Sequence, residues 1–262
     1  MDVLVFDIET IPDLALIRKL HDWNNMNDEQ THAAIMAKYQ AEKGTTFLPL
    51  HLHQIVAISL VMRRDHNVKV WSLGTMESDE ADLIQRFYTG IERYTPTLVS
   101  WNGTGFDLPV LHYRALKHGI VASQYWDSGD RRQDFKYNNY VNRYHQRHLD
   151  VMDILSLYQA RASVKLDQMA MMLGYPGKMG MAGDKVYEAY ADNRLKDIRD
   201  YCETDVLNTY LVFLRFQMMR GLLTPEDLAA EEQLLQEMLA HESEQPENDH
   251  LAEFLATWLA SN

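Results

Sequence analysis

The most constraining feature of the chain is a short apolar segment near its start that ends in alternating acids. Residues 2–8 are rich in apolar and β-branched side chains and are followed by Pro12, which predicts a short buried strand. Side chains two apart in a strand point to the same face, so Asp7 and Glu9 should project together. Such a pair at the end of a strand indicates either a cation site or a solvent-exposed acidic pair.

The rest of the chain alternates between strand-like and helix-like segments. Further strands are expected at 55–62, 68–73 and 97–101, helical composition at 13–43, and helices at 79–93, 108–118, 195–220, from Pro225 onward and at 251–259. This order predicts an α/β fold with a mixed sheet of about five strands flanked by helices. We expect 1–221 to form this domain and 222–262 a helical C-terminal extension. Its last helix, 251–259, is expected to dock on its own chain in preference to a partner.

A second acid follows the strand expected at 97–101. Asp107 comes after a turn, Asn102-Gly103-Thr104-Gly105-Phe106, and opens a helix that has Pro109 just inside it. The simplest role for Asp107 is capping of that helix. The glycines favour a second role, because they let a phosphate or a metal approach the backbone closely.

A third acidic segment lies within the long helix expected at 195–220. Tyr201 and Asp205 are four residues apart and therefore share one helix face. On that face Asp205 could hold a metal while the Tyr201 hydroxyl reaches a substrate, although each residue alone is also typical of an ordinary helix surface. Cys202, between them, is expected to be a buried thiol, since no base flanks it.

The three segments FDIET, NGTGFDLPVL and YCETD, in this order, resemble the exonuclease motifs of the DEDD superfamily in its tyrosine-bearing branch. Specifically, the chain resembles stand-alone proteins similar to the 3′–5′ proofreading exonuclease domain of family B DNA polymerases. The resemblance implies a ribonuclease H-like fold and hydrolysis with two Mg²⁺ or Mn²⁺ ions. It implies that Asp7, Glu9, Asp107 and Asp205 hold the metals and that Tyr201 completes the catalytic set.

Contacts with the substrate are expected from the motifs and from two loops. Within the motifs, the candidates are Thr10, Asn102 and Phe106. Residues 124–149 interleave basic and aromatic side chains, a pattern suited to single-stranded nucleic acid; their candidates are Arg131, Arg132, Tyr137 and Tyr140. Lys178 is a candidate from the glycine-rich segment 174–185. The alternative for 124–149 is an aromatic loop packed on the sheet, and the alternative for 174–185 is a plain connecting loop.

Bulk composition limits the partners and the compartment. The net charge of −13 argues against a surface that is broadly basic, so nucleic acid must bind a local groove. The sequence has no apolar run of 18 residues and no signal-peptide pattern, so we expect no membrane contact. The single cysteine fits a reducing compartment, and we expect a cytoplasmic protein. Protein partners cannot be named from the sequence.

These observations predict a metal-dependent exonuclease that digests single-stranded DNA from its 3′ end. Two alternatives remain open at this point. One is the same chemistry on the 3′ end of RNA, and the other is a catalytically idle module that binds nucleic acid. An idle module has no physical need for four acids gathered without compensating cations, which favours an enzyme.

Overall fold

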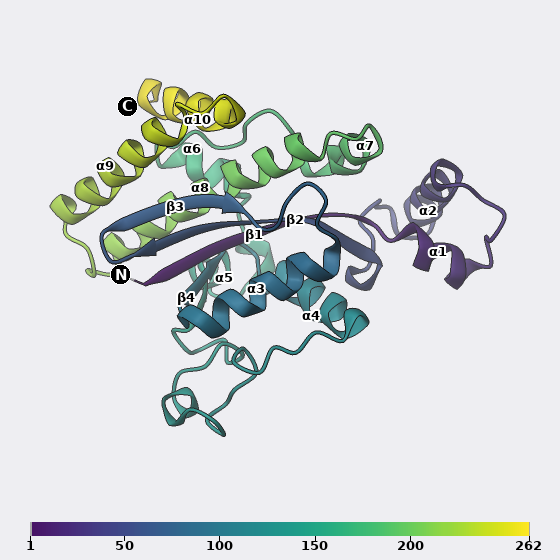
Figure 1. The fold of residues 1–262 in the computed structure, drawn as a ribbon, viewed down its shortest axis with the longest axis horizontal. Coiled ribbons are helices and arrows are strands. Elements are labelled where there is room, and N and C mark those ends of the chain that lie inside the picture. Colours follow the sequence, from purple (N-terminus) through teal and green to yellow (C-terminus); the bar gives the residue numbers. More distant parts are fainter. Residues whose placement is uncertain (1, 262) are drawn as a thin grey trace.

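The computed structural model describes residues 2–261 and contains a mixed five-stranded sheet in the order β3-β2-β1-β4-β5 (Figure 1). The strands are β1 (Val3–Pro12), β2 (His53–Arg64), β3 (Asn67–Ser72), β4 (Thr97–Ser100) and β5 (His148–Asp150). Strand β2 is antiparallel to both β1 and β3, whereas β4 pairs in parallel with β1 and β5 pairs in parallel with β4. This is the predicted α/β architecture, and it matches the ribonuclease H-like fold.

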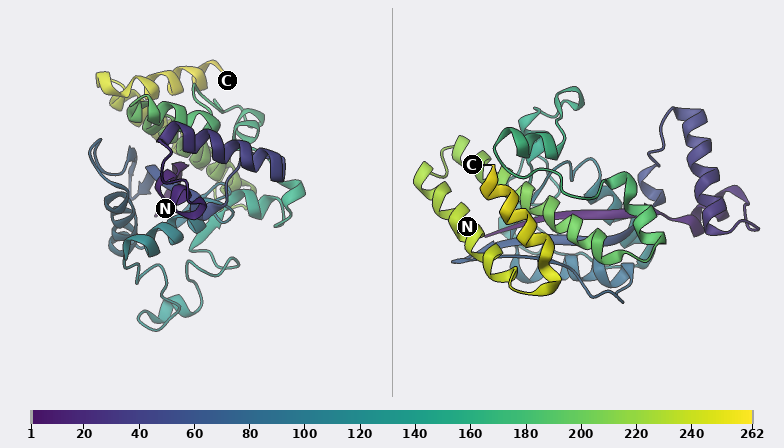
Figure 2. Two further views of the ribbon diagram at one scale, coloured as in Figure 1. Left: turned by 90° about the vertical axis from the view of Figure 1, so that its right-hand side faces the viewer. Right: turned by 90° about the horizontal axis from the view of Figure 1, so that it is seen from above.

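Helices cover both faces of the sheet (Figures 1 and 2). One face packs on α3 (Glu80–Tyr94) and α4 (Asp107–His118), and the other packs on α6 (Leu166–Met172) and α8 (Leu195–Met219). Strand β1 separates the two layers by alternation, since Val5 joins the α8 cluster and Phe6 joins the α3–α4 cluster. The same alternation sends Asp7 and Glu9 towards α8.

The expected strands and helices are confirmed, with a few additions. Strand β5 escaped prediction because three residues are too few to show a period of two. Three short helices also escaped it: α5 (Val151–Leu155), α6 and α7 (Val186–Ala191). The helical composition of 13–43 resolves into α1 (Leu14–His21) and α2 (Asp28–Lys43), with Asp22 in the left-handed conformation at the end of α1.

Helices α1 and α2 form an excursion that projects beyond the end of the sheet (Figure 1). The chain leaves β1 and returns to β2 at one point, where the Asp13 amide donates to the Leu52 carbonyl at 2.7 Å. The Asp13 carboxylate accepts hydrogen bonds from Arg114 at 2.6 Å and from Lys117 at 2.8 Å. The base of the excursion is therefore fixed to α4.

The C-terminal residues pack on the body of the chain, as preferred from the sequence. Helix α9 (Pro225–Glu242) begins at the expected Thr224 cap, and α10 (Asp249–Ala260) begins two residues before the predicted 251. Both helices share one hydrophobic cluster with α8, to which they contribute the buried side chains Leu228, Leu235, Leu239, Leu251, Phe254 and Trp258. Within residues 2–261, no helix combines the length and apolarity needed to cross a membrane.

Because this cluster is shared, residues 222–262 should unfold together with the rest of the domain. Trp258 is 1% exposed, and Trp258→Ala should lower the free energy of unfolding by about 3–5 kcal/mol. Denaturant unfolding followed by circular dichroism should show one transition at a lower midpoint. Two transitions in the wild-type protein would instead establish 222–262 as an independent unit.

Candidate metal-dependent active site

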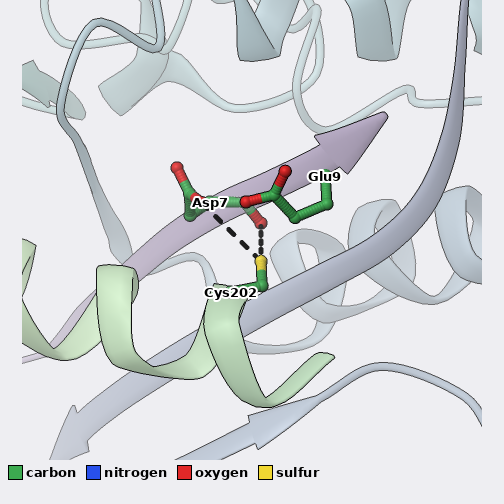
Figure 3. Close-up of side chains that lie close together, drawn as sticks. All are labelled: Asp7, Glu9 and Cys202. Atoms are coloured by element: carbon green, nitrogen blue, oxygen red, sulfur yellow. Dashed lines mark hydrogen bonds between the residues drawn. The ribbon is translucent and has the colours of Figure 1, made fainter. Parts of the chain in front are cut away.

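The second half of β1 presents two carboxylates, those of Asp7 and Glu9, to the N-terminal half of α8 (Figure 3). Asp7 is half-buried and Glu9 is 8% exposed. One carboxylate oxygen of Asp7, one of Glu9 and the Cys202 sulfur all lie within 4.8 Å of one another. The Cys202 thiol donates to the Asp7 carbonyl at 3.5 Å and to its Oδ2 atom at 3.7 Å. The thiol is buried, as expected, and it joins the helix to the acidic strand.

Helix α8 brings Tyr201 and Asp205 to the same place. The charge of Asp205 raises the pKa of both Asp7 and Glu9, which shows that the three carboxylates lie close together. The Tyr201 hydroxyl interacts with the Asp205 carboxylate, and this hydrogen bond opposes the rise in the pKa of Asp205 that burial causes. The predicted i, i+4 pair therefore faces the acids of β1 as one unit.

Asp107 reaches the site because the parallel pairing of β1 and β4 ends early. The pairing stops at Val5 and Val99, so the Ile8 amide is available on that edge of β1. The Asp107 Oδ1 atom accepts a hydrogen bond from this amide at 3.1 Å. Asp107 is 4% exposed and is the first residue of α4, with Phe106 at the cap position. Its carboxylate is thus turned towards β1 and is not used to cap its own helix.

The turn before Asp107 is held by a further acid, Asp150. Its two carboxylate oxygens accept from the amides of Asn102 at 3.0 Å and Thr104 at 2.8 Å. Asp150 also caps α5, because its Oδ1 atom accepts a hydrogen bond from the Asp153 amide at 3.2 Å. Packing within the turn explains Gly105, because a Cβ atom there would lie 2.5 Å from Asn102 Oδ1. This glycine serves the compact turn itself.

Electrostatic strain concentrates at the four carboxylates. Burial, followed by mutual repulsion, raises the pKa of Asp7 and of Glu9 well above their usual range. Burial raises the pKa of Asp107 to about 7 and that of Asp205 to about 6. Four acids in this state are stable together only if protons or bound cations neutralise their charge. The donor set consists of carboxylate oxygens, which suit hard divalent cations such as Mg²⁺ or Mn²⁺.

Two cavities flank the carboxylates, and they differ in charge. One, of about 310 Å³, is lined by Lys165, Leu166, Asp167, Lys178, Tyr201 and Asp205. The positive charge of Lys178 opposes the rise in the pKa of Glu9 and Asp205, so its ammonium group lies near both. The structure therefore brings Lys178 to the site, together with Lys165, which the sequence reasoning missed.

The second cavity, of about 660 Å³, begins at Glu9 and contains aromatic side chains but, among the described residues that line it, no lysine or arginine. Thr10, Asn102 and Phe106 line it, so all three motif residues expected to contact a substrate lie beside the acids. Two further aromatic side chains, Phe47 and His53, line it as well. No periodic pattern indicated them, because Phe47 lies in the segment between α2 and β2 and His53 is the first residue of β2.

The basic and aromatic loop is not brought to the acids. Arg132 donates to Thr95 Oγ1 at 3.1 Å, and the Tyr140 hydroxyl donates to the Pro96 carbonyl at 2.6 Å. Thr95 and Pro96 precede β4, whereas the acids lie beyond its other end. Tyr140 is 2% exposed, so its predicted stacking on a base is wrong.

Arg131 and Tyr137 lie on the same segment as Arg132, and both are exposed to solvent. The amide of Arg131, like that of Arg132, donates to the carboxylate of Asp127, which ties this part of the loop to itself. The alternative stated for the loop, an aromatic segment packed on the domain, describes Phe135 and Tyr140, which join the α3–α4 cluster.

Comparisons with known proteins agree with this geometry. Residues 45–258 match a family described as predicted 3′–5′ exonucleases related to the exonuclease domain of PolB. The chain belongs to this family. The matched residues include Asp107, Tyr201 and Asp205, whereas Asp7 and Glu9 precede them. The family assignment makes the chain an enzyme with a nucleic-acid substrate.

Among solved structures, the chain is similar to the family B DNA polymerase from the hyperthermophilic archaeon Pyrobaculum calidifontis. The TM-score is 0.52 at 16% identity, and the similarity covers 98% of this chain and 28% of the polymerase. At this identity the likeness shows the fold alone. A search among curated proteins finds no match.

The raised pKa values predict that a divalent cation stabilises the protein more at about pH 8 than at about pH 5. The folded-state pKa values of Asp107, about 7, and Asp205, about 6, exceed the usual 3.8. Their ionisation therefore removes stability as the pH rises from about 4 to about 7, and a bound cation restores it. At acidic pH the cation must displace protons.

Thermal unfolding with and without Mn²⁺ measures this effect. At a cation concentration of about 100 Kd, the midpoint should rise by about 5–10 °C at the higher pH and by less at the lower pH. Asp107→Asn should reduce the rise. An equal rise at both pH values would contradict the assignment.

Proposed function

We propose that the chain removes nucleotides from the 3′ end of single-stranded DNA by hydrolysis, with two Mg²⁺ or Mn²⁺ ions held by Asp7, Glu9, Asp107 and Asp205. The observation that carries this proposal is the convergence of four buried or half-buried carboxylates from three distant segments, each with a raised pKa. Two such ions, when bound, would stabilise negative charge on the attacking and leaving oxygens of a phosphodiester.

Tyr201 acts in this proposal as a hydrogen-bond donor. It is 9% exposed, and burial together with the charge of Asp205 raises its pKa above the usual 10. The phenol therefore stays protonated at neutral pH and orients the attacking water or the scissile phosphate. Lys178 supplies positive charge beside Glu9 and Asp205, where a phosphate would otherwise meet only acids.

The two flanking cavities support a direction for the strand. The cavity beyond Glu9 is aromatic and, within the described residues, has no cationic side chain, which suits a nucleobase. The cavity beyond Asp205 has Lys165 and Lys178, which suit phosphates of the continuing strand. We therefore assign the terminal nucleotide to the side of Thr10, Asn102 and Phe106. The buried free thiol of Cys202 is consistent with the proposed cytoplasmic location.

Removal of a metal-binding carboxylate should abolish hydrolysis. Digestion of a 5′-labelled single strand with Mn²⁺ should give a ladder that shortens from the 3′ end, and Asp205→Ala should give none. Tyr201→Phe should lose activity by at most about 10³-fold, the range for removing one donor from a transition state. The matched control is Glu237→Gln, an exposed acid on α9, which should digest at the wild-type rate.

The same experiment with an RNA strand tests the polymer. Faster digestion of RNA would assign the site to exoribonuclease chemistry and would overturn the preference for DNA. Full activity of Asp205→Ala after stringent purification would overturn the metal assignment.

A further inference from the structure

We propose that Phe47 is a specificity-determining residue, which stacks on the base of the terminal nucleotide and closes the aromatic cavity over an unpaired 3′ end. This inference rests on the proposed function and deepens it. The strap is defined here as residues 45–48, which follow α2 and return the chain to β2. It supplies four of the residues that line the cavity beyond Glu9.

The strap is anchored to the catalytic strand through His53. Leu48 is 2% exposed and packs in a small core with side chains of α1 and α2. The Leu48 carbonyl lies 3.1 Å from His53 Nε2, and the opposite ring atom, Nδ1, lies 2.8 Å from Thr10 Oγ1. Thr10 follows Glu9 in β1. The position of the strap is therefore coupled to the strand that holds the metal-binding acids.

Phe47 lines the cavity, and its side chain is largely exposed to solvent. It is 58% exposed, although its ring centroid is 5.4 Å from that of His53 and 5.8 Å from that of Phe106. His53 and Phe106 meet edge to face at 5.2 Å. A single exposed phenylalanine is ordinary on a protein surface. Phe47, however, belongs to a group of aromatic side chains that line one cavity together with Glu9. Such an aromatic surface is what base stacking requires.

A second wall faces the strap across the cavity. Gly183, Asp184 and Tyr187 line this side, and the Tyr187 ring stacks on His32 of α2 with centroids 3.7 Å apart. The stack joins the excursion to α7. A base that enters is thus enclosed by β1, the turn before Asp107, the strap and α7. In this proposal, a base that enters the cavity of about 660 Å³ has left its pairing partner.

Binding of a strand with a fluorescent base, 2-aminopurine, at its 3′ terminus tests the inference. The strand is titrated with Asp205→Ala protein so that it is not digested. Stacking should quench the fluorescence, and adding Phe47→Ala should remove the quenching and weaken binding by about 5- to 150-fold. Phe47→Trp should retain both. The matched control is Tyr113→Ala, another exposed aromatic residue, which lies on α4 outside the lining of the cavity and should bind like the parent protein.

A strand whose last nucleotide lacks its base separates stacking from a general loss of affinity. Phe47→Ala should not change the affinity for this strand. If Phe47→Ala weakens binding of both strands equally, or of neither, the proposed stacking of Phe47 on the terminal base is overturned. Wild-type protein with Mn²⁺ is assayed in parallel on single strands and on blunt duplexes. If the protein digests neither the single strands nor the duplexes, the proposed function is overturned. If it digests both at equal rates, only the selection of unpaired ends is overturned.

Discussion

The structure depends on one electrostatic constraint: four carboxylates are gathered in a place where burial makes their ionisation unfavourable. Asp107 and Asp205 have pKa values of about 7 and 6 for this reason, and Asp7 and Glu9 are raised further by their neighbours. Folding has to overcome this repulsion through packing elsewhere. The same repulsion favours cation binding, because a bound cation neutralises the carboxylates and relieves the repulsion between them.

The scaffold meets this constraint with rigid elements. Helix α8 has 25 residues, and fifteen of them are buried, so Tyr201 and Asp205 are held by a well-packed element. The early end of the β1–β4 pairing leaves the Ile8 amide available for Asp107. Asp150, outside the metal-binding set, fixes the turn that precedes Asp107. Each acid is therefore oriented by a backbone feature of an ordinary sheet or helix.

The elements that we propose to distinguish substrates lie on segments outside the central sheet and α8. The excursion of α1 and α2 leaves and returns at the Asp13–Leu52 contact, so it reaches past the sheet while β1 and β2 stay paired up to Pro12 and His53. Its strap then supplies an aromatic wall beside Glu9. Lys165 and Lys178 supply positive charge on the other side of the acids, which answers the objection raised by a net charge of −13.

The sequence by itself determined the fold class and the acidic set, because strand alternation and helix periodicity are local and the acids belong to recognisable motifs. Only the tertiary structure decided which loops meet those acids. Composition favoured the segment with Arg132 and Tyr140, yet this segment lies at the other end of β4, and Phe47 takes a place that no local pattern indicated. A loop's position depends on where its two ends are fixed in space, and residue composition does not encode that.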